Sequence, residues 1–165
     1  MDEPLSFQFD DDGAIPNSRF PLLVYRAALP ADPAAIERVF AAHHWPPAWR
    51  NGVYRFHHFH SSAHEVLGIA RGQVTVLFGG PLGQELTVEA GDVVVVPAGV
   101  GHCNQNQSPD LLIVGAYPGN GPDPDMHRGT PAEHAAVKRS IAAVRKPDMD
   151  PVVGQAGPLL RLWDR

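Results

Sequence analysis

The chain has 165 residues, of which 44% are apolar, and its formal net charge is −5. This length and this apolar fraction suffice for one domain with its own hydrophobic core. Two lysines and no run of basic residues give no electrostatic footprint for a phosphate backbone, so we expect no nucleic-acid partner.

The cysteine content and the start of the chain indicate the compartment. Cys103 is the only cysteine, which excludes an intrachain disulfide and favours a reducing environment. Residues 1–13 are acidic and lack the positive end and apolar stretch of an export signal. No apolar run approaches the roughly 20 residues that cross a bilayer. We therefore expect a cytoplasmic protein without a membrane span.

The first third of the chain predicts one strand and one helix. Residues 20–26 can form an edge strand, because Pro21 is tolerated only on an edge or at a strand start. Asp32 as N-cap and Pro33 in the first turn, followed by apolar residues at helical spacing, predict a helix over 33–44.

Beyond Gly52 the sequence changes to short apolar segments separated by glycines, a pattern typical of β-strands. The connections are short enough for antiparallel pairing. Strands are expected at 53–60, 65–70, 73–78, 84–88, 93–96, 102–107 and 111–116. Such closely spaced strands favour a sandwich or a barrel.

The region after Tyr117 is rich in glycine, proline and aspartate. Thr130 and Glu133 have the spacing of a capping box with Pro131 at the first helical position, which predicts a helix over 131–144. Its apolar side can cover a sheet edge, and we expect the tail to be ordered only by docking. No internal repeat is visible, so one site per chain is expected.

Four histidines lie in the predicted strand 53–60 and in the segment that joins it to the predicted strand 65–70. Strand alternation places His58 and His60 on one face and His57 on the other, so His57 is excluded from the candidate site. A short turn over residues 61–64 can bring Glu65 back beside the two histidines. A hairpin would thus bring three candidate ligands together.

The fourth candidate ligand, His102, comes from far along the chain. Residues 97–101 are expected to form a tight turn that delivers it onto the next strand. There alternation places Asn104 and Asn106 on its face and Cys103 on the opposite one, where an isolated cysteine packs as a small hydrophobe.

Three imidazoles and one carboxylate suit iron, manganese, nickel, cobalt, copper or zinc, and are too rich in nitrogen for calcium or magnesium. We expect one divalent transition metal per chain, and affinity alone does not choose among these metals.

These residues also match a known pattern. Gly52, His58-Phe59-His60, Glu65 and Gly72 resemble the first cupin motif at its fixed positions. The second motif is matched by Gly91, Pro97-Ala98-Gly99, His102 and Asn106. Both motifs lie within residues 52–106, about a third of the chain, and the surrounding sequence resembles a bacterial subgroup, the YjlB-like small cupins.

The resemblance implies an all-β fold, the cupin double-stranded β-helix or jelly-roll barrel, here with an N-terminal and a C-terminal helix. It implies that His58, His60, Glu65 and His102 bind the metal and that Asn106 is structural.

We expect a single domain over residues 1–165. It would comprise an N-terminal segment (1–48), the cupin barrel core (49–117) and a C-terminal extension (118–165). Cupin barrels often pair through exposed strands, so a homodimer is expected.

The function stays open between several classes, because the fold implies no substrate. An iron-type dioxygenase or related oxidoreductase acting on a small organic molecule ranks slightly ahead of a metal-dependent sugar isomerase or epimerase. A non-catalytic small-molecule binding module, or histidines that merely fill a polar interior, are the alternatives from other classes. No separate catalytic residue is identified, and His64 remains an alternative ligand should the turn before Glu65 differ.

Overall fold

The computed structural model describes residues 2–164, which form two antiparallel sheets and three helices. The strands are β1 (Leu5–Phe7), β2 (Leu22–Tyr25), β3 (Pro47–Asn51), β4 (Glu65–Arg71), β5 (Gln73–Phe78), β6 (Gln84–Glu89), β7 (Val93–Val96), β8 (His102–Gln107) and β9 (Leu112–Ala116). The helices are α1 (Pro33–Ala42), α2 (His134–Ala143) and α3 (Pro158–Leu162).

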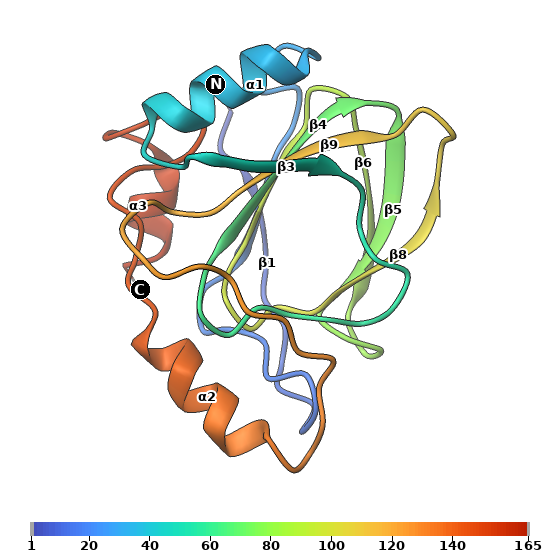
Figure 1. Ribbon diagram of the computed structural model, residues 1–165, viewed down its shortest axis with the longest axis vertical. Coiled ribbons are helices and arrows are strands. Elements are labelled where there is room, and N and C mark those ends of the chain that lie inside the picture. Colours follow the sequence, from blue (N-terminus) through green and yellow to red (C-terminus); the bar gives the residue numbers. More distant parts are fainter. Residues whose placement is uncertain (1, 165) are drawn as a thin grey trace.

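The two sheets wrap around a common interior and form the expected jelly-roll barrel (Figure 1). The larger sheet has the strand order β1-β2-β7-β4-β9-β3, and the smaller one β6-β5-β8. The prediction of an all-β cupin barrel with helices in the N-terminal and C-terminal regions is therefore confirmed.

The larger sheet is buried on both faces over its central strands. On β7, Val94 and Val96 face the barrel interior, whereas Val93 and Val95 pack in a second cluster with residues of α1 and α3. This double burial explains why β7 is an uninterrupted apolar run instead of an alternating one.

Helix α1 lies directly on this sheet (Figure 1). Its N-cap is Asp32, whose side chain accepts a hydrogen bond from the backbone N–H of Ala35 at 2.8 Å. Its buried residues Ile36 and Phe40 meet β4 at Gly68, where an added Cβ would lie 2.6 Å from Ile36 Cγ2. A glycine is therefore required at this crossing.

The predicted strand over residues 53–60 is wrong. The strand that precedes the histidines is β3, at the edge of the larger sheet, and it begins with Pro47, a position where a proline costs no ladder hydrogen bond. Residues 53–60 are irregular except for single bridges from His58 to His102 and from Phe59 to His127. Their backbone divides its hydrogen bonds among β8, Gly99 and His127, and so cannot continue one ladder.

The capping box predicted at Thr130 is also wrong. Helix α2 begins at His134, and its N-cap Glu133 makes no side-chain capping bond. Thr130 contributes only its carbonyl, which accepts from the Glu133 N–H at 3.3 Å. Residues 131–133, the first predicted turn of the helix, form a separate hydrogen-bonded turn before it.

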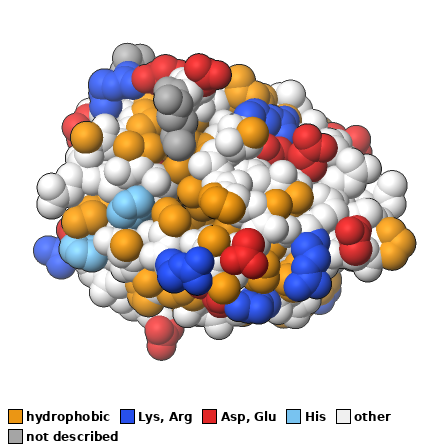
Figure 2. All heavy atoms as spheres, turned by 90° about the horizontal axis from the view of Figure 1, so that it is seen from above, with side chains coloured by type: hydrophobic (Ala, Val, Ile, Leu, Met, Phe, Trp, Pro, Cys, Tyr) orange, Lys and Arg blue, Asp and Glu red, His pale blue; other side chains and the backbone are white. Residues whose placement is uncertain are grey.

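Acidic and basic side chains are interspersed over the face that carries α1 instead of gathering by sign (Figure 2). Among residues 2–164, no helix combines the length and the apolar character needed to span a bilayer.

The tail docks through a buried carboxylate. Asp150 is fully buried and accepts hydrogen bonds from the Tyr25 hydroxyl at 2.6 Å and from the backbone N–H groups of Val152 and Leu159 at 2.8 and 3.1 Å. Burial and the Asp150 carboxylate raise the pKa of Tyr25 far above its usual range, so its hydroxyl remains a donor. These bonds join α3 to β2.

We predict that Tyr25→Phe lowers the free energy of unfolding by about 2 kcal/mol, because a buried carboxylate loses a donor. Urea unfolding followed by circular dichroism measures the change. Tyr54→Phe, at a residue that is 58% exposed, is the matched control and should leave stability unchanged. Wild-type stability of Tyr25→Phe would contradict this account of the docking.

Candidate metal centre

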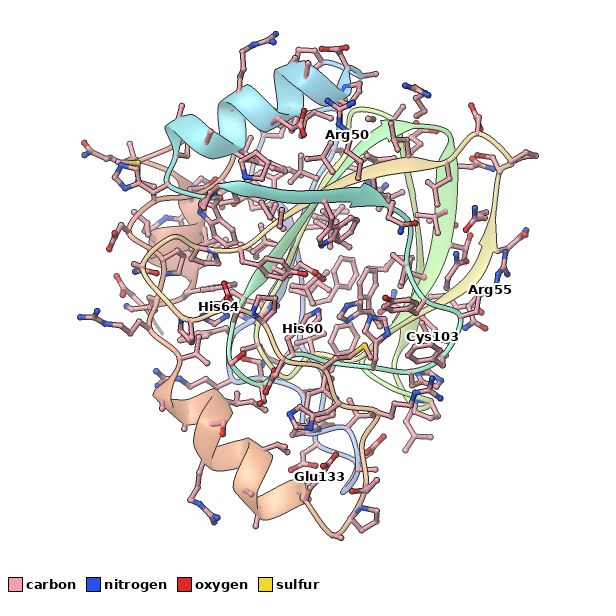
Figure 3. All side chains as sticks on the ribbon, viewed as in Figure 1. Arg50, Arg55, His60, His64, Cys103 and Glu133 are labelled. Carbon is pink, nitrogen blue, oxygen red and sulfur yellow. The ribbon has the colours of Figure 1, made fainter. Side chains whose placement is uncertain are left out.

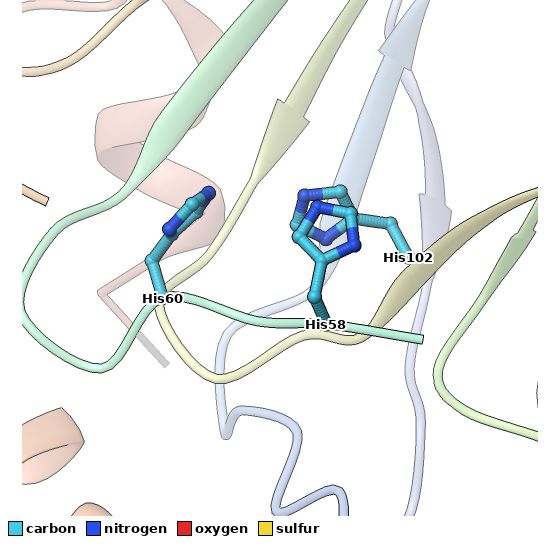
Figure 4. Close-up of side chains that lie close together, drawn as sticks. All are labelled: His58, His60 and His102. Atoms are coloured by element: carbon cyan, nitrogen blue, oxygen red, sulfur yellow. The ribbon is translucent and has the colours of Figure 1, made fainter. Parts of the chain in front are cut away.

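Three histidines from two separate segments converge inside the barrel. His60 lies on the irregular segment that follows β3 (Figure 3). His58 lies on the same segment, and His102 is the first residue of β8. The antiparallel bridge between His58 and His102 fixes their approach, with backbone hydrogen bonds of 3.2 and 2.9 Å and ring centroids 4.0 Å apart. One nitrogen of each ring lies within 4.8 Å of the other two (Figure 4).

The backbone sets the tautomer of all three rings. The Nδ1 of His58 bonds to the Phe56 carbonyl at 2.9 Å, that of His102 to the Val100 carbonyl at 3.1 Å, and that of His60 to the Asp125 carbonyl. A carbonyl can only accept, so each Nδ1 carries the hydrogen. Each neutral ring therefore keeps its lone pair on Nε2, the arrangement found in metal-binding histidines.

Glu65, at the start of β4, is the anionic member of the cluster. Its carboxylate is buried, with Oε2 3.4 Å from His60 Nε2 and Oε1 3.3 Å from His102 Nε2. Burial raises the pKa of Glu65, but the two histidines outweigh it and hold that pKa far below its usual range. The site therefore keeps a buried negative charge.

The pKa values of His58 and His60 shift in opposite directions. Burial, and then the proximity of His102, lower the pKa of His58 to about 3. Burial also opposes the charged form of His60, but the Glu65 carboxylate prevails and raises its pKa. A buried carboxylate is costly without a positive partner, which a proton on His60 or a metal ion can supply. His58, His60 and His102 lie close enough together to hold a metal ion, and the Glu65 carboxylate adjoins two of them.

The loop after β9 supports His60 through Asp125. Besides its carbonyl contact to His60, Asp125 accepts from the backbone N–H groups of Ser61 and Ser62 at 2.6 and 3.1 Å and from the Ser61 hydroxyl. Burial raises the pKa of Asp125, but the hydrogen bonds from Ser61 outweigh it and lower the pKa to about 2. Asp125 thus ties the C-terminal extension to the turn that carries a candidate ligand.

His64 lies outside this cluster. It is buried, and its Nδ1 accepts the Ala98 N–H at 2.9 Å, while its ring packs against Trp163 with centroids 4.7 Å apart. Cys103 is buried as expected.

The predicted face of Asn106 is wrong because β8 contains a bulge. Val76 pairs with Asn104 but Thr75 pairs with Asn106, so one extra residue, Gln105, shifts the alternation. Asn106 is exposed, and Gln107 points inward instead, where its Oε1 accepts from Asn104 Nδ2 at 2.7 Å.

A cavity of about 740 Å³ opens over the cluster, and His58, His60, Glu65 and His102 all line it. Tyr117 also borders it and receives a 3.0 Å hydrogen bond from Trp49 Nε1. Burial and the Glu65 carboxylate raise the pKa of Tyr117, which keeps its hydroxyl protonated.

Asp125, Gln107 and Tyr117 line the cavity, but the sequence alone did not identify them as lining residues. No motif in the sequence points to these three residues.

Comparison with known proteins places the chain in a family. The family model described as Cupin matches residues 50–128. The Bacillus subtilis (strain 168) protein named Uncharacterized protein YjlB is 42% identical over 162 residues, which cover 98% of this chain and 97% of that protein.

Three solved structures are distant matches. A DUF861 family protein from Thermotoga maritima is 23% identical, covers 43% of this chain and 75% of its own, and has a TM-score of 0.32. Procruciferin, an 11S globulin from Brassica napus, is 12% identical, and the match covers 72% of this chain and 30% of procruciferin, with a TM-score of 0.37. Streptomyces albus HEPD, with 2-hydroxyethylphosphonate and Fe(II) bound, is 12% identical, and the match covers 93% of this chain and 30% of HEPD, with a TM-score of 0.27. At these scores the three likenesses carry no argument about chemistry.

We predict that Asp125→Ala lowers the free energy of unfolding by about 2 kcal/mol in the presence of a chelator, because two backbone N–H groups lose their acceptor. Urea unfolding measures the difference. Asp123→Ala removes an exposed carboxylate from the same loop and should change stability little. Equal effects of the two substitutions would contradict the role assigned to Asp125.

Proposed function

Since the chain belongs to the YjlB-like small cupins, we propose that it is a metal-dependent enzyme acting on a small organic molecule, with an iron-type dioxygenase as the reaction class. The observation that carries the proposal is the buried Glu65 carboxylate facing three imidazoles whose Nδ1 hydrogens are all held by carbonyls.

The proposed ligands are His58, His60 and His102 through Nε2, and Glu65 through its carboxylate. They would hold one divalent transition metal per chain: iron, manganese, nickel, cobalt, copper or zinc. Such an ion, when bound, supplies Lewis-acid and oxygen-binding chemistry.

The other residues of the cavity favour an oxygenase over a sugar isomerase. An isomerase that moves a proton needs a positioned base. Among the described lining residues, the ionisable groups outside the ligand set are two tyrosines, Arg50 and Asp125. The Arg50 guanidinium is bound to Glu37, and Asp125 is engaged by Ser61, so neither offers a free basic group.

One side chain outside the ligand set would manage a proton in this site. Glu65, as a proposed metal ligand, would have its carboxylate engaged by the ion. The Tyr117 hydroxyl, whose pKa is raised, would remain a donor toward an oxygen of the substrate.

The proposal includes a cytoplasmic homodimer. Strands β1 and β3 are the two edges of the larger sheet, and an edge strand presents unpaired backbone groups that a second copy can use. Analytical ultracentrifugation of the full chain distinguishes a dimer from a monomer.

We predict that untagged protein purified without chelator contains about one equivalent of a transition metal per chain by elemental analysis. His58→Ala and His102→Ala should each lose most of it, because each removes a proposed ligand. His57→Ala, one residue away, should retain it.

Circular dichroism of each variant separates loss of a ligand from loss of fold. A wild type that is metal-free and also refuses reloading with each of the six metals would favour the non-catalytic binding module.

We further predict that iron-loaded protein consumes oxygen in step with the disappearance of its substrate in a screen of small organic compounds, and that the His102→Ala variant does neither. An oxygen electrode and chromatography measure the two quantities. Conversion that proceeds equally well without oxygen would instead favour the isomerase.

A further inference from the structure

The wall of the cavity above the histidines is rich in aromatic and apolar side chains. Trp49, Tyr54 and Tyr117 supply three aromatic rings. Aliphatic surface comes from Val53, Leu67, Leu111, Leu112 and Met126. A wall of this kind gains most from a ligand with a flat apolar body.

Tyr54 is exposed but held in a defined orientation. Its side chain is 58% exposed, yet its ring stacks on Phe56 with centroids 4.9 Å apart and an interplanar angle of 13°. Phe56 is in turn covered by the Arg128 guanidinium, 3.6 Å from the ring centroid. The Tyr54 ring also meets His58 edge-on at 5.4 Å. An ordered, accessible ring therefore stands beside a proposed metal ligand.

The charged side chains of the cavity wall do not favour a ligand that carries an anionic group. Arg50 (Figure 3) is the cationic lining residue besides the histidines. Glu37 on α1 accepts hydrogen bonds from its Nε and Nη2. Phosphate recognition relies on cationic side chains, and the Glu37 carboxylate already neutralises the one guanidinium of the described lining.

The neutral polar groups of the wall are few. The amides of Asn51 and Gln107 are the neutral polar side chains outside the aromatic residues. The Gln107 Oε1 is already bonded to Asn104. A sugar, with a hydroxyl on nearly every carbon, would find few free partners among these neutral groups.

We propose that the cavity binds a planar aromatic molecule with an uncharged body and ring hydroxyls that reach the histidine cluster, and that Tyr54 is the residue that selects the ring. The inference rests on the proposed function for the role of the metal, whereas ring selection by Tyr54 stands on the wall alone.

The test is anaerobic isothermal titration calorimetry of the full-length protein, freed of unbound metal, with catechol, D-xylose and D-glucose 6-phosphate as probes. Catechol should bind most tightly. Tyr54→Ala should weaken catechol binding about tenfold, because the stacking and burial of one ring are lost. Tyr54→Phe keeps the ring and should bind within about twofold of wild type.

Leu82→Ala, at a residue that is 86% exposed and outside the cavity, is the control and should bind catechol as the wild type does. Tighter binding of xylose or glucose 6-phosphate than of catechol overturns the inference, as does wild-type affinity in Tyr54→Ala. Thermal melting of each variant excludes unfolding as the cause of a loss.

The metal content of the same samples separates this inference from the proposed function. If the wild type is metal-free and its catechol binding still depends on Tyr54, the proposed metalloenzyme function is wrong and ring selection by Tyr54 is supported. Metal-loaded protein that prefers the sugar phosphate retains the metal site and overturns ring selection.

Discussion

The site depends on one electrostatic constraint, the burial of the Glu65 carboxylate among three imidazoles. Carbonyl groups hold the Nδ1 hydrogens of His58, His60 and His102, so the rings present lone pairs to that carboxylate unless they gain a proton. A buried negative charge is costly without a positive partner. The pKa values of Glu65 and His60 shift in the directions that favour their charged forms, which reflects the same demand.

The barrel brings the Glu65 carboxylate and the three histidines together at one place. Glu65 stands at the start of β4, a strand with both neighbours in the larger sheet, and is thereby held rigidly. His102 is paired with Phe78 in the smaller sheet, so the cluster lies where the two sheets meet. The irregular backbone of residues 53–60 lets His58 pair with His102 while Phe59 pairs with His127.

The part of the chain after β9 completes the surroundings of the site. Asp125 supports His60 from outside the matched cupin motifs, and Met126 beside it lines the cavity. Farther along the chain, Asp150 joins the tail to Tyr25 on β2. The chain after β9 is therefore part of the structure that shapes the cavity.

The sequence alone determined the β architecture and most strand positions through local alternation and glycine turns, and the two motifs of fixed spacing named the four side chains that come together. It failed over residues 53–60 and at Asn106, where an irregular segment and a bulge override alternation. The contacts of Asp125 with His60 and Ser61 span more than 60 residues. Such contacts arise only when the chain folds back on itself, so the tertiary structure alone decided what supports and surrounds the site.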